Sequence, residues 1–231
     1  MISIIPISGI GKIAKGDDLA ELFLNELQTY FPLLNSDCLV VASKVISKSR
    51  GRVEEITHEN SKEKIIQRES KRILRKRDSL IISETHHGFI CANAGIDESN
   101  TEENTVVLLP KEIDNAAHGL RKSILSICGF DISVVISDTF GRPFRMGETN
   151  VALGYSGLKS FADLRGTKDL YGKELNATTI AIADEIASAA ELVMHKNSGN
   201  CAALVRGLPD SYRGEGKASD LIRKASEDLF R

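Results

Sequence analysis

The sequence predicts a mixed α+β fold, and three features of the chain support this. Short β-rich segments alternate with amphipathic helical segments over 231 residues, of which 42% are hydrophobic. The strand-like segments between residues 79 and 109 follow one another without helices, which disfavours a strictly doubly wound sheet. No repeat, low-complexity tract or long linker marks a boundary between domains. We therefore expect one folded unit over residues 1–231.

The first elements are two buried strands with a helix between them. The apolar runs Met1–Ile7 and Cys38–Ala42 are typical of strands that are covered on both faces. Asp18 followed by Glu21 has the spacing of a capping box at the start of a helix. The apolar positions after Asp18 repeat with the helical period, and Pro32 sets the latest point at which the helix can end.

The next region is strongly basic. Residues 44–77 contain twelve Lys or Arg and five Glu, although the whole chain has a net charge of −2. A helix is predicted from Asn60 to about Arg77, and the segment Ser43–Lys48 is predicted to be a loop after the second strand. Loops at strand ends commonly hold ligands in α/β folds. The basic region is therefore either a solvated helix face or a surface that handles anions.

The rest of the chain continues the alternation. Turns and irregular structure with short strands are predicted between Gly141 and Gly172, where glycine is frequent. Helices are predicted after Glu112, over Thr179–Met194 and over Ala218–Phe230. The remaining strands are predicted at Ser79–Ser83, Phe89–Ala92, Val106–Leu109, Ile132–Ser137 and Ala202–Val205.

Composition excludes several classes of protein. A net charge of −2 does not suit a general polyanion binder, and no apolar run approaches the length of a membrane span. The first residues lack the basic and apolar regions of a signal peptide, so we expect a cytoplasmic protein without nucleic-acid or membrane partners. The four cysteines are scattered and form no C-x-x-C pair, which favours buried thiols over a zinc site.

Two acidic loops are the strongest candidates for chemistry. Asn93–Asn100 and Ser137–Arg142 each follow a predicted strand and carry short oxygen-bearing side chains. Such oxygens suit Mg²⁺ or Mn²⁺, usually together with phosphate oxygens. Each loop alone could equally be a turn in which Asp accepts backbone N–H bonds. His86 and His87 cannot place both rings on one face of a strand, so we interpret them as structural, or at most as one polar contact.

The turn Gly9–Lys12 is a weaker signal. It follows the first predicted strand, but it matches neither the Walker A sequence nor the three-glycine dinucleotide fingerprint. A simple turn with a solvated lysine is the alternative.

Taken together, these motifs resemble those of the coenzyme F-420-0:gamma-glutamyl ligase family. The resemblance runs in the same order through essentially the whole chain. It includes both acidic loops, the Gly9–Lys12 turn and Ser43-Lys44 with Lys48, and further segments at Asp169–Leu175, Ala183–Ala187 and Val205–Leu208. It implies a ligase that adds L-glutamate to F-420-0 through a gamma-linked amide bond, with GTP as co-substrate.

The resemblance also implies roles for individual residues. Asp97, Asp138 and Thr139 correspond to metal ligands for two Mg²⁺ or Mn²⁺ ions, and K⁺ is a further expected ion. Asp97, Asp138 and Arg142 are expected to take part in catalysis, with Arg142 holding phosphate or carboxylate. The residues that correspond to nucleotide contacts are Gly9, Ile10, Gly11, Lys12, Ser43, Lys44, Lys48, Asn100, Met194, His195 and Lys196. Lys196 departs from the pattern of archaeal members, which have an acidic metal ligand at about this place.

An intertwined homodimer is the assembly that the resemblance implies. Each chain would have a larger α/β part, about residues 1–78 with 147–231, and a smaller β-rich part, about residues 79–146. Some bacterial relatives carry a nitroreductase-like flavin domain after this unit, and we expect this chain, which ends at Arg231, to lack it.

Two other functions use the same residues. A metal-dependent phosphohydrolase would transfer the phosphoryl group to water, and a regulatory module would bind the nucleotide without turnover. The number of glutamates added, the exact acceptor and the preference between Mg²⁺ and Mn²⁺ do not follow from the sequence.

Overall fold

A mixed five-stranded sheet forms the centre of the molecule. The computed structural model describes residues 1–229 of the chain. The strand order is β1-β12-β2-β8-β9, in which only β2 and β8 pair in parallel. The bounds are Ser3–Ile7 for β1, Ala202–Arg206 for β12, Cys38–Ala42 for β2, Ser133–Gly141 for β8 and Glu148–Ser156 for β9. Since helices and several sheets occur together, the predicted α+β class is confirmed.

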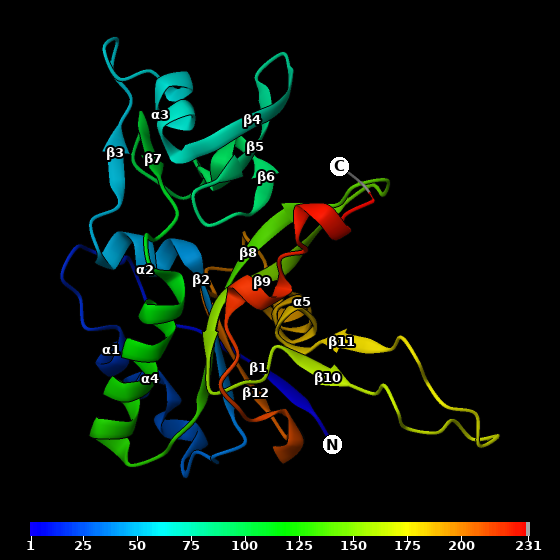
Figure 1. The fold of residues 1–231 in the computed structure, drawn as a ribbon. Coiled ribbons are helices and arrows are strands. Elements are labelled where there is room, and N and C mark those ends of the chain that lie inside the picture. Colours follow the sequence, from blue (N-terminus) through cyan, green and yellow to red (C-terminus); the bar gives the residue numbers. More distant parts are fainter. Residues whose placement is uncertain (230–231) are drawn as a thin grey trace.

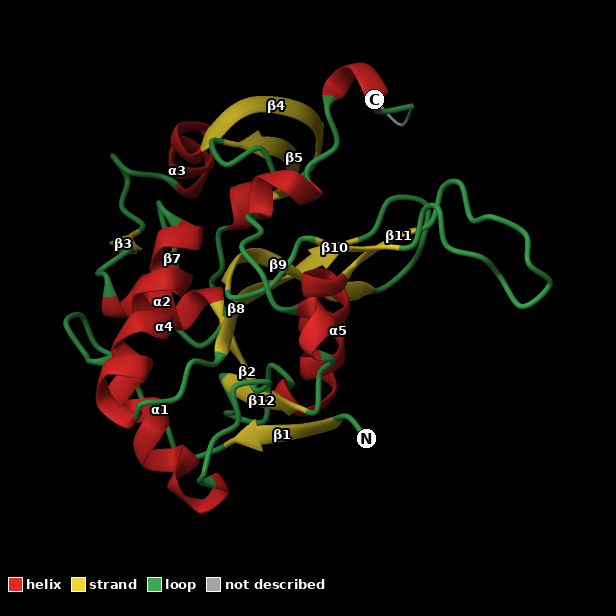
Figure 2. Cartoon of the chain, turned by 60° about the horizontal axis from the view of Figure 1, so that its bottom comes forward, coloured by secondary structure: helices red, strands yellow, loops and turns green. Residues whose placement is uncertain are grey.

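Helices cover both faces of this sheet. The helices α1 (Leu19–Leu27), α2 (Ser43–Ser49) and α4 (Ile113–Cys128) lie on one side, and α5 (Ile182–Met194) lies on the other (Figures 1 and 2). Successive residues of β2 and β8 alternate between the two hydrophobic cores, as the period of two along a strand requires. Because both faces are buried, these strands appear in the sequence as continuous apolar runs.

A smaller part sits beyond one end of the sheet, at the top of Figure 1. It contains a two-stranded sheet, a three-stranded sheet and the helix α3 (Lys62–Glu69). Its strands are β3 (Val53–Glu55), β4 (Ser70–Arg77), β5 (Leu80–Thr85), β6 (Ile90–Ala92) and β7 (Thr105–Val107). Strand pairing crosses the positions 78/79 and 146/147 that the sequence suggested as boundaries, because β4 pairs with β5 and β8 pairs with β9.

A hairpin arm projects from the body near α5 (Figure 1). Its strands β10 (Phe161–Asp163) and β11 (Thr179–Ala181) pair in antiparallel, and residues 164–178 form the loop beyond them. Short 3₁₀ turns complete the described chain at Gln28–Tyr30, Asn93–Gly95, Asp210–Tyr212, Ala218–Leu221 and Ala225–Glu227.

The predicted start of the first helix is confirmed. The Asp18 carboxylate accepts hydrogen bonds from the backbone N–H groups of Ala20 at 2.9 Å and Glu21 at 3.2 Å. These bonds satisfy two of the donors that a helix N-terminus leaves free. The strand prediction Cys38–Ala42 matches β2 at both ends, and α4 begins directly after Glu112 as expected.

The predicted helix from Asn60 to about Arg77 is wrong in its second half. Helix α3 ends at Glu69, and the chain continues as β4 from Ser70. Antiparallel pairing with β5 decides the conformation of this polar run. Lys71 and Arg72 both reach the Glu84 carboxylate on β5, at 3.1 and 2.9 Å. Tertiary pairing thus overrides the helical spacing of the few apolar residues.

Other predicted elements also need correction. The expected loop Ser43–Lys48 is the helix α2, and residues 141–172 include the nine-residue strand β9. The helix predicted from Thr179 begins at Ile182, after the strand β11. The closing helix predicted from Ala218 is replaced by two 3₁₀ turns, and its last predicted residue, Phe230, lies outside the described residues.

The cysteines behave as the sequence predicted. All four thiols are free, with Cys38 and Cys91 buried and Cys128 and Cys201 partly buried. Among residues 1–229, no helix combines the length and the hydropathy that crossing a bilayer requires.

Candidate active site

Four chain segments meet at one edge of the central sheet. Since β1 and β2 both pair in antiparallel with β12, they run in the same direction, and β8 is parallel to β2. The carboxyl ends of β1, β2 and β8 and the amino end of β12 therefore share an edge. The segments that continue from these ends carry most of the residues that the family resemblance singled out, as expected for a ligand site in such a sheet.

Asp97 is held by Lys44 and by its own loop. Lys44 extends from α2, and its ammonium lies 2.7 Å from the Asp97 carboxylate. The same ammonium donates to the hydroxyl of Ser99 at 2.8 Å and to the Ser99 carbonyl. Burial alone would raise the pKa of Asp97, but hydrogen bonds from Lys44 and Ser99 outweigh it and lower that pKa. Asp97 is therefore a stable anion at neutral pH.

Asp138 lies in a less compensated environment on β8. Its carboxylate accepts one hydrogen bond within the described chain, from the backbone N–H of Thr139 at 2.9 Å. Burial raises the pKa of Asp138 to about 7, and the negative charge of Asp97 adds to this effect. The positive charges of Lys196 and Lys44 act in the opposite direction. The two predicted carboxylates are thus close enough to influence each other, and both are within reach of lysine charges.

The Thr139 hydroxyl is prepared to act as an oxygen ligand. It donates its proton to the Asn150 side-chain oxygen at 2.8 Å, and the Asn150 amide in turn donates to Glu191 at 2.9 Å. The lone pairs of the hydroxyl oxygen are therefore left free. Within residues 1–229 no three Asp, Glu, His or Cys side chains form a metal-binding group. Two carboxylates and a hydroxyl nevertheless form an oxygen-only donor set that fits a hard divalent cation with water and phosphate as its other ligands.

Hydrogen bonds link Lys48 to two of the loops that were predicted to contact the nucleotide. Lys48 on α2 donates to the Asn100 carbonyl at 2.7 Å, and the Asn100 amide donates to the Lys196 carbonyl at 3.2 Å. Burial lowers the pKa of Lys48, and the charges of Lys44 and Lys12 lower it further. The ammonium groups of Lys44 and Lys12 thus lie close enough to Lys48 to act on its charge, and such a cluster is suited to an anion.

The Gly9–Lys12 turn joins the same cluster. Gly9 has φ of +90°, a backbone conformation that favours glycine. The neighbouring Ser8 hydroxyl donates to the Asn200 side chain at 2.8 Å, which links this turn to the 195–200 loop. Gly11 also has positive φ, whereas the side chain of Ile10 is buried in the core.

Four further predicted site residues lie differently. Met194 ends α5 with its side chain buried in the core, so only its backbone is available to a ligand, and His195 follows as an exposed residue. Ser43 is the first residue of α2 and is buried. Arg142 is not brought to the carboxylates. Its guanidinium donates to the carbonyls of Met146 at 2.6 Å and Gly147 at 3.3 Å and closes the turn between β8 and β9.

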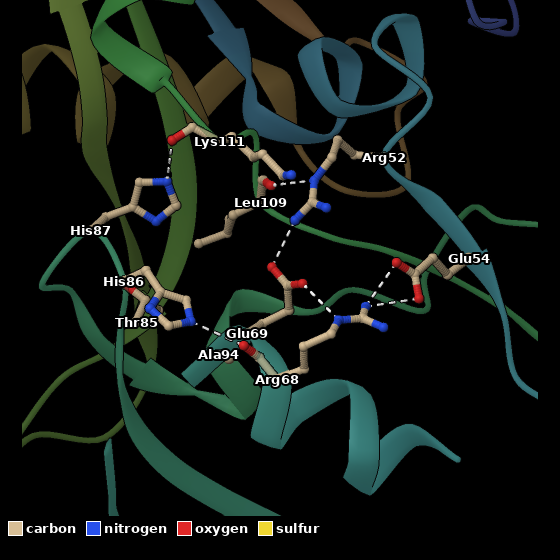
Figure 3. A pocket seen from close by; sticks show the side chains of 10 residues that line it. All are labelled: Arg52, Glu54, Arg68, Glu69, Thr85, His86, His87, Ala94, Leu109 and Lys111. Carbon is tan, nitrogen blue, oxygen red and sulfur yellow. Dashed lines mark hydrogen bonds and ion pairs between the residues drawn. The ribbon is translucent and has the colours of Figure 1, made fainter. Parts of the chain in front are cut away.

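A separate pocket of about 600 Å³ lies beneath the smaller part (Figure 3). Arg52, Arg68, Lys111 and the pair His86 and His87 contribute to its lining. His86 bonds the Arg68 carbonyl at 2.9 Å and His87 the Lys111 carbonyl at 2.8 Å. The histidines therefore make one polar contact each through Nε2.

Known protein sequences match this chain over the segments that form the site. The sequence model of the F420-0:Gamma-glutamyl ligase family matches residues 9–207. The chain belongs to this family. A protein of Methanothermobacter thermautotrophicus named coenzyme F420:L-glutamate ligase is 38% identical, covering 100% of this chain and 99% of that protein. Proteins of the same name from Methanopyrus kandleri and Archaeoglobus fulgidus are 40% and 37% identical. The alignments cover 95% and 100% of this chain and 94% and 96% of those proteins. The family resemblance seen in the motifs is thereby confirmed.

Sequence reasoning missed the residues that support the predicted ligands. These are Asn150 and Glu191, which hold the Thr139 hydroxyl. Ser99, which accepts from Lys44, lies inside the acidic loop that the sequence singled out. Asn150 had a detectable signal, because it is a polar residue directly before the apolar stretch 151–155 of β9. Glu191 had none, since it lies on α5 and reaches the site only through the packing of that helix on β9.

Proposed function

We propose that this chain is a ligase that joins L-glutamate to coenzyme F-420-0 through a gamma-linked amide bond and consumes GTP. Membership of the family and the names of the relatives support the reaction class and the two substrates. The observation that carries the proposal is the meeting of two carboxylates and three lysines at one edge of the sheet. GTP dependence rests on the family resemblance and on the suitability of this cationic edge for phosphates.

The reaction needs an activated carboxyl group, because a free carboxylate is a poor electrophile. In the proposed route a carboxylate oxygen of the acceptor attacks the γ-phosphorus of GTP, and the bond from that phosphorus to the GDP oxygen breaks. The glutamate amine then attacks the acyl carbon, phosphate leaves, and the amine loses a proton as the amide forms. GTP, acceptor and glutamate thus yield GDP, phosphate and the amide product. All three substrates are anions, so the site must offset their mutual repulsion.

The residues at the edge have distinct proposed tasks. Asp97, Asp138 and Thr139 would hold a divalent cation, with Mg²⁺ or Mn²⁺ as candidates. When bound, the cation neutralises charge on the phosphate oxygens. Lys44 and Lys48 donate hydrogen bonds to phosphate, for which the ammonium groups must leave the loop acceptors that they now contact. Asn150 and Glu191 keep the Thr139 oxygen oriented.

Isotope transfer tests both the activity and the route. The protein is incubated with GTP, Mn²⁺, L-glutamate and F-420-0 whose carboxylate carries ¹⁸O, and phosphate and product are analysed by mass spectrometry. Ligation through an acyl phosphate places one ¹⁸O in the released phosphate. Phosphate release that requires neither F-420-0 nor glutamate would support the phosphohydrolase instead, and GTP binding without turnover would support the regulatory module.

A homodimer is part of the same proposal. It rests on the family resemblance alone. Light scattering should give twice the chain mass of 25.2 kDa, and a mass equal to one chain at micromolar concentration would contradict it.

A further inference from the structure

The pocket beneath the smaller part has a chain of ion pairs along one wall. Arg52 donates to Glu69 at 2.6 Å, Glu69 also accepts from Arg68 at 3.3 Å, and Arg68 binds both oxygens of Glu54 at 2.7 and 2.8 Å (Figure 3). Arg52 is held further by a bond to the Leu109 carbonyl at 3.2 Å. These bonds fix the orientation of the arginines before any ligand arrives, which lowers the entropy cost of binding.

Two cationic donors in this pocket remain available. Lys111 has no ion-pair partner within residues 1–229, and Figure 3 shows its side chain extended toward the guanidinium of Arg52. Of the three guanidinium nitrogens of Arg52, Nη1 makes no hydrogen bond to the described chain. An ammonium beside a partly free guanidinium is a recognition site for a carboxylate.

The pocket also contains an acceptor without a donor. The Nε2 of His87 contacts a carbonyl, which can only accept, so Nε2 carries the proton and Nδ1 of the neutral ring is an acceptor. This Nδ1 is buried and has no hydrogen-bond partner in the described structure. The ring stacks on Phe89 with centroids 5.7 Å apart, which keeps its orientation fixed. A buried acceptor left unpaired costs free energy until a donor reaches it.

We propose that this pocket binds the acidic amino acid that is ligated, and this proposal rests on the proposed function. Three cations and two carboxylates line the pocket, so with neutral histidines its net charge is +1. An amino acid with two carboxylates and one ammonium has a net charge of −1 and offers donors as well as acceptors. Its carboxylates pair with Lys111 and Arg52, and its ammonium donates to the acceptors of the same wall. A nucleotide triphosphate would instead meet the carboxylates of Glu54 and Glu69.

The pocket is connected to the carboxylate edge by short segments. Ala94 lines the pocket and precedes Asp97 by three residues in the same loop. Phe89, which stacks on His87, also packs edge-on against Phe140, the neighbour of Thr139 on β8. The pocket and the carboxylate edge are therefore joined by one loop and by one pair of packed rings.

Steady-state kinetics with varied L-glutamate tests the assignment. Lys111→Gln and Arg52→Lys are compared with wild type and with Lys122→Gln, which removes an exposed lysine from α4 and serves as the control. We expect the KM for glutamate to rise roughly tenfold to a hundredfold in the two pocket variants, as loss of a charge-assisted bond predicts. The KM for GTP and the kcat at saturating glutamate should stay within about twofold of wild type. Melting curves verify that each variant is folded.

The outcomes separate the two proposals. If wild type makes the glutamylated product while both pocket variants keep its KM for glutamate, the pocket assignment is overturned and the ligase function stands. If wild type makes no product, the proposed function fails. Calorimetry with L-glutamate then tests whether the pocket binds this amino acid. Binding by wild type and Lys122→Gln that is lost in Lys111→Gln supports the assignment, whereas no binding by wild type overturns it.

Discussion

Asp37 and Asp138 lie at opposite ends of the two parallel strands in the central sheet. Asp37 directly precedes β2, and Asp138 lies one residue beyond the register pair Ala42 and Ser137 that ends the pairing of β2 with β8. The fully buried Asp37 binds Arg206 through two hydrogen bonds of 2.8 and 2.7 Å and accepts a third from the backbone of Leu34 at 2.8 Å. Asp138 accepts a single backbone bond at 2.9 Å.

This difference separates a carboxylate whose charge the protein balances from one whose charge it leaves partly unbalanced. The charge of Asp37 is balanced inside the protein, so the residue closes one end of the sheet and has no capacity left for a ligand. The charge of Asp138 is only partly balanced, and its raised pKa records that deficit. Groups with perturbed pKa values are concentrated at functional sites because the missing partner is supplied by substrate or metal.

The largest expected effect is the loss of activity in Asp138→Asn. The amide is nearly isosteric, but it lacks the negative charge that a divalent cation requires from its ligands. We expect ligase turnover to fall by about three orders of magnitude or more, equivalent to over ~4 kcal/mol of transition-state stabilisation. The melting temperature should stay at or above that of wild type, since an uncompensated buried charge is removed. Turnover close to wild type would contradict a role for Asp138 in metal binding.

Asp37→Asn should show the reverse pattern. It leaves the Arg206 guanidinium, which is 27% exposed, without its carboxylate, so we expect a loss of about 2–4 kcal/mol of stability. Chemical denaturation measures this loss, and turnover per folded molecule should remain within about twofold of wild type. A stable but inactive Asp37→Asn protein would contradict the claim that Asp37 serves stability and Asp138 serves activity.

Lys48→Ala tests the cationic side of the same edge. Lys48 is partly buried on α2 and donates to the Asn100 carbonyl, so its removal should cost at most about 1 kcal/mol of stability. Loss of a charge-assisted bond to phosphate should weaken GTP binding by roughly 1.5–3 kcal/mol. Calorimetric titration provides the measurement, with Lys122→Ala as the surface control. Equal GTP affinity in both variants would remove Lys48 from the site.

The smallest expected effect is a pH dependence specific to Asp138. Its pKa is raised from 3.8 to about 7 in the folded chain, so between these values the folded state binds more protons than the unfolded state. Stability of the metal-free protein should therefore fall as pH rises through this window. After allowance for solvent screening, wild type should lose about 1 kcal/mol more than Asp138→Asn between pH 5 and pH 8. Parallel denaturation curves at the two pH values would detect this, and identical losses would contradict the raised pKa.

The sequence predicted the sheet better than the small part. All of β2 and the segment Val134–Ile136 of β8 are continuous apolar runs, so their strand character is local information. The run Ser70–Arg77 is mostly charged, and only the partner strand β5, with Glu84, makes it a strand. This pairing across a hairpin leaves no periodic apolar signal in the segment Ser70–Arg77 itself.

In the candidate site, too, locally patterned residues were predictable and residues paired by folding were not. Asp97 and Asp138 were predictable because short oxygen ligands after strands are a local pattern. In the structure the two lie close enough that the charge of Asp97 helps to raise the pKa of Asp138. The ion-paired wall of the pocket was not predictable from the sequence. Its residues Arg52, Glu54, Arg68 and Glu69 lie in the basic region 44–77, where a solvated surface was an equally good interpretation, and they pair only in the folded chain.

Manganese binding measured on three proteins tests the central claim most directly. Metal-free wild type, Asp138→Asn and Asp37→Asn are titrated with Mn²⁺ at pH 8 and followed by electron paramagnetic resonance of the free ion. Wild type and Asp37→Asn should remove Mn²⁺ from solution with similar affinity, and Asp138→Asn should bind it at least about tenfold more weakly. Equal Mn²⁺ affinity in wild type and Asp138→Asn would contradict the assignment of this edge of the sheet as the metal and phosphate site.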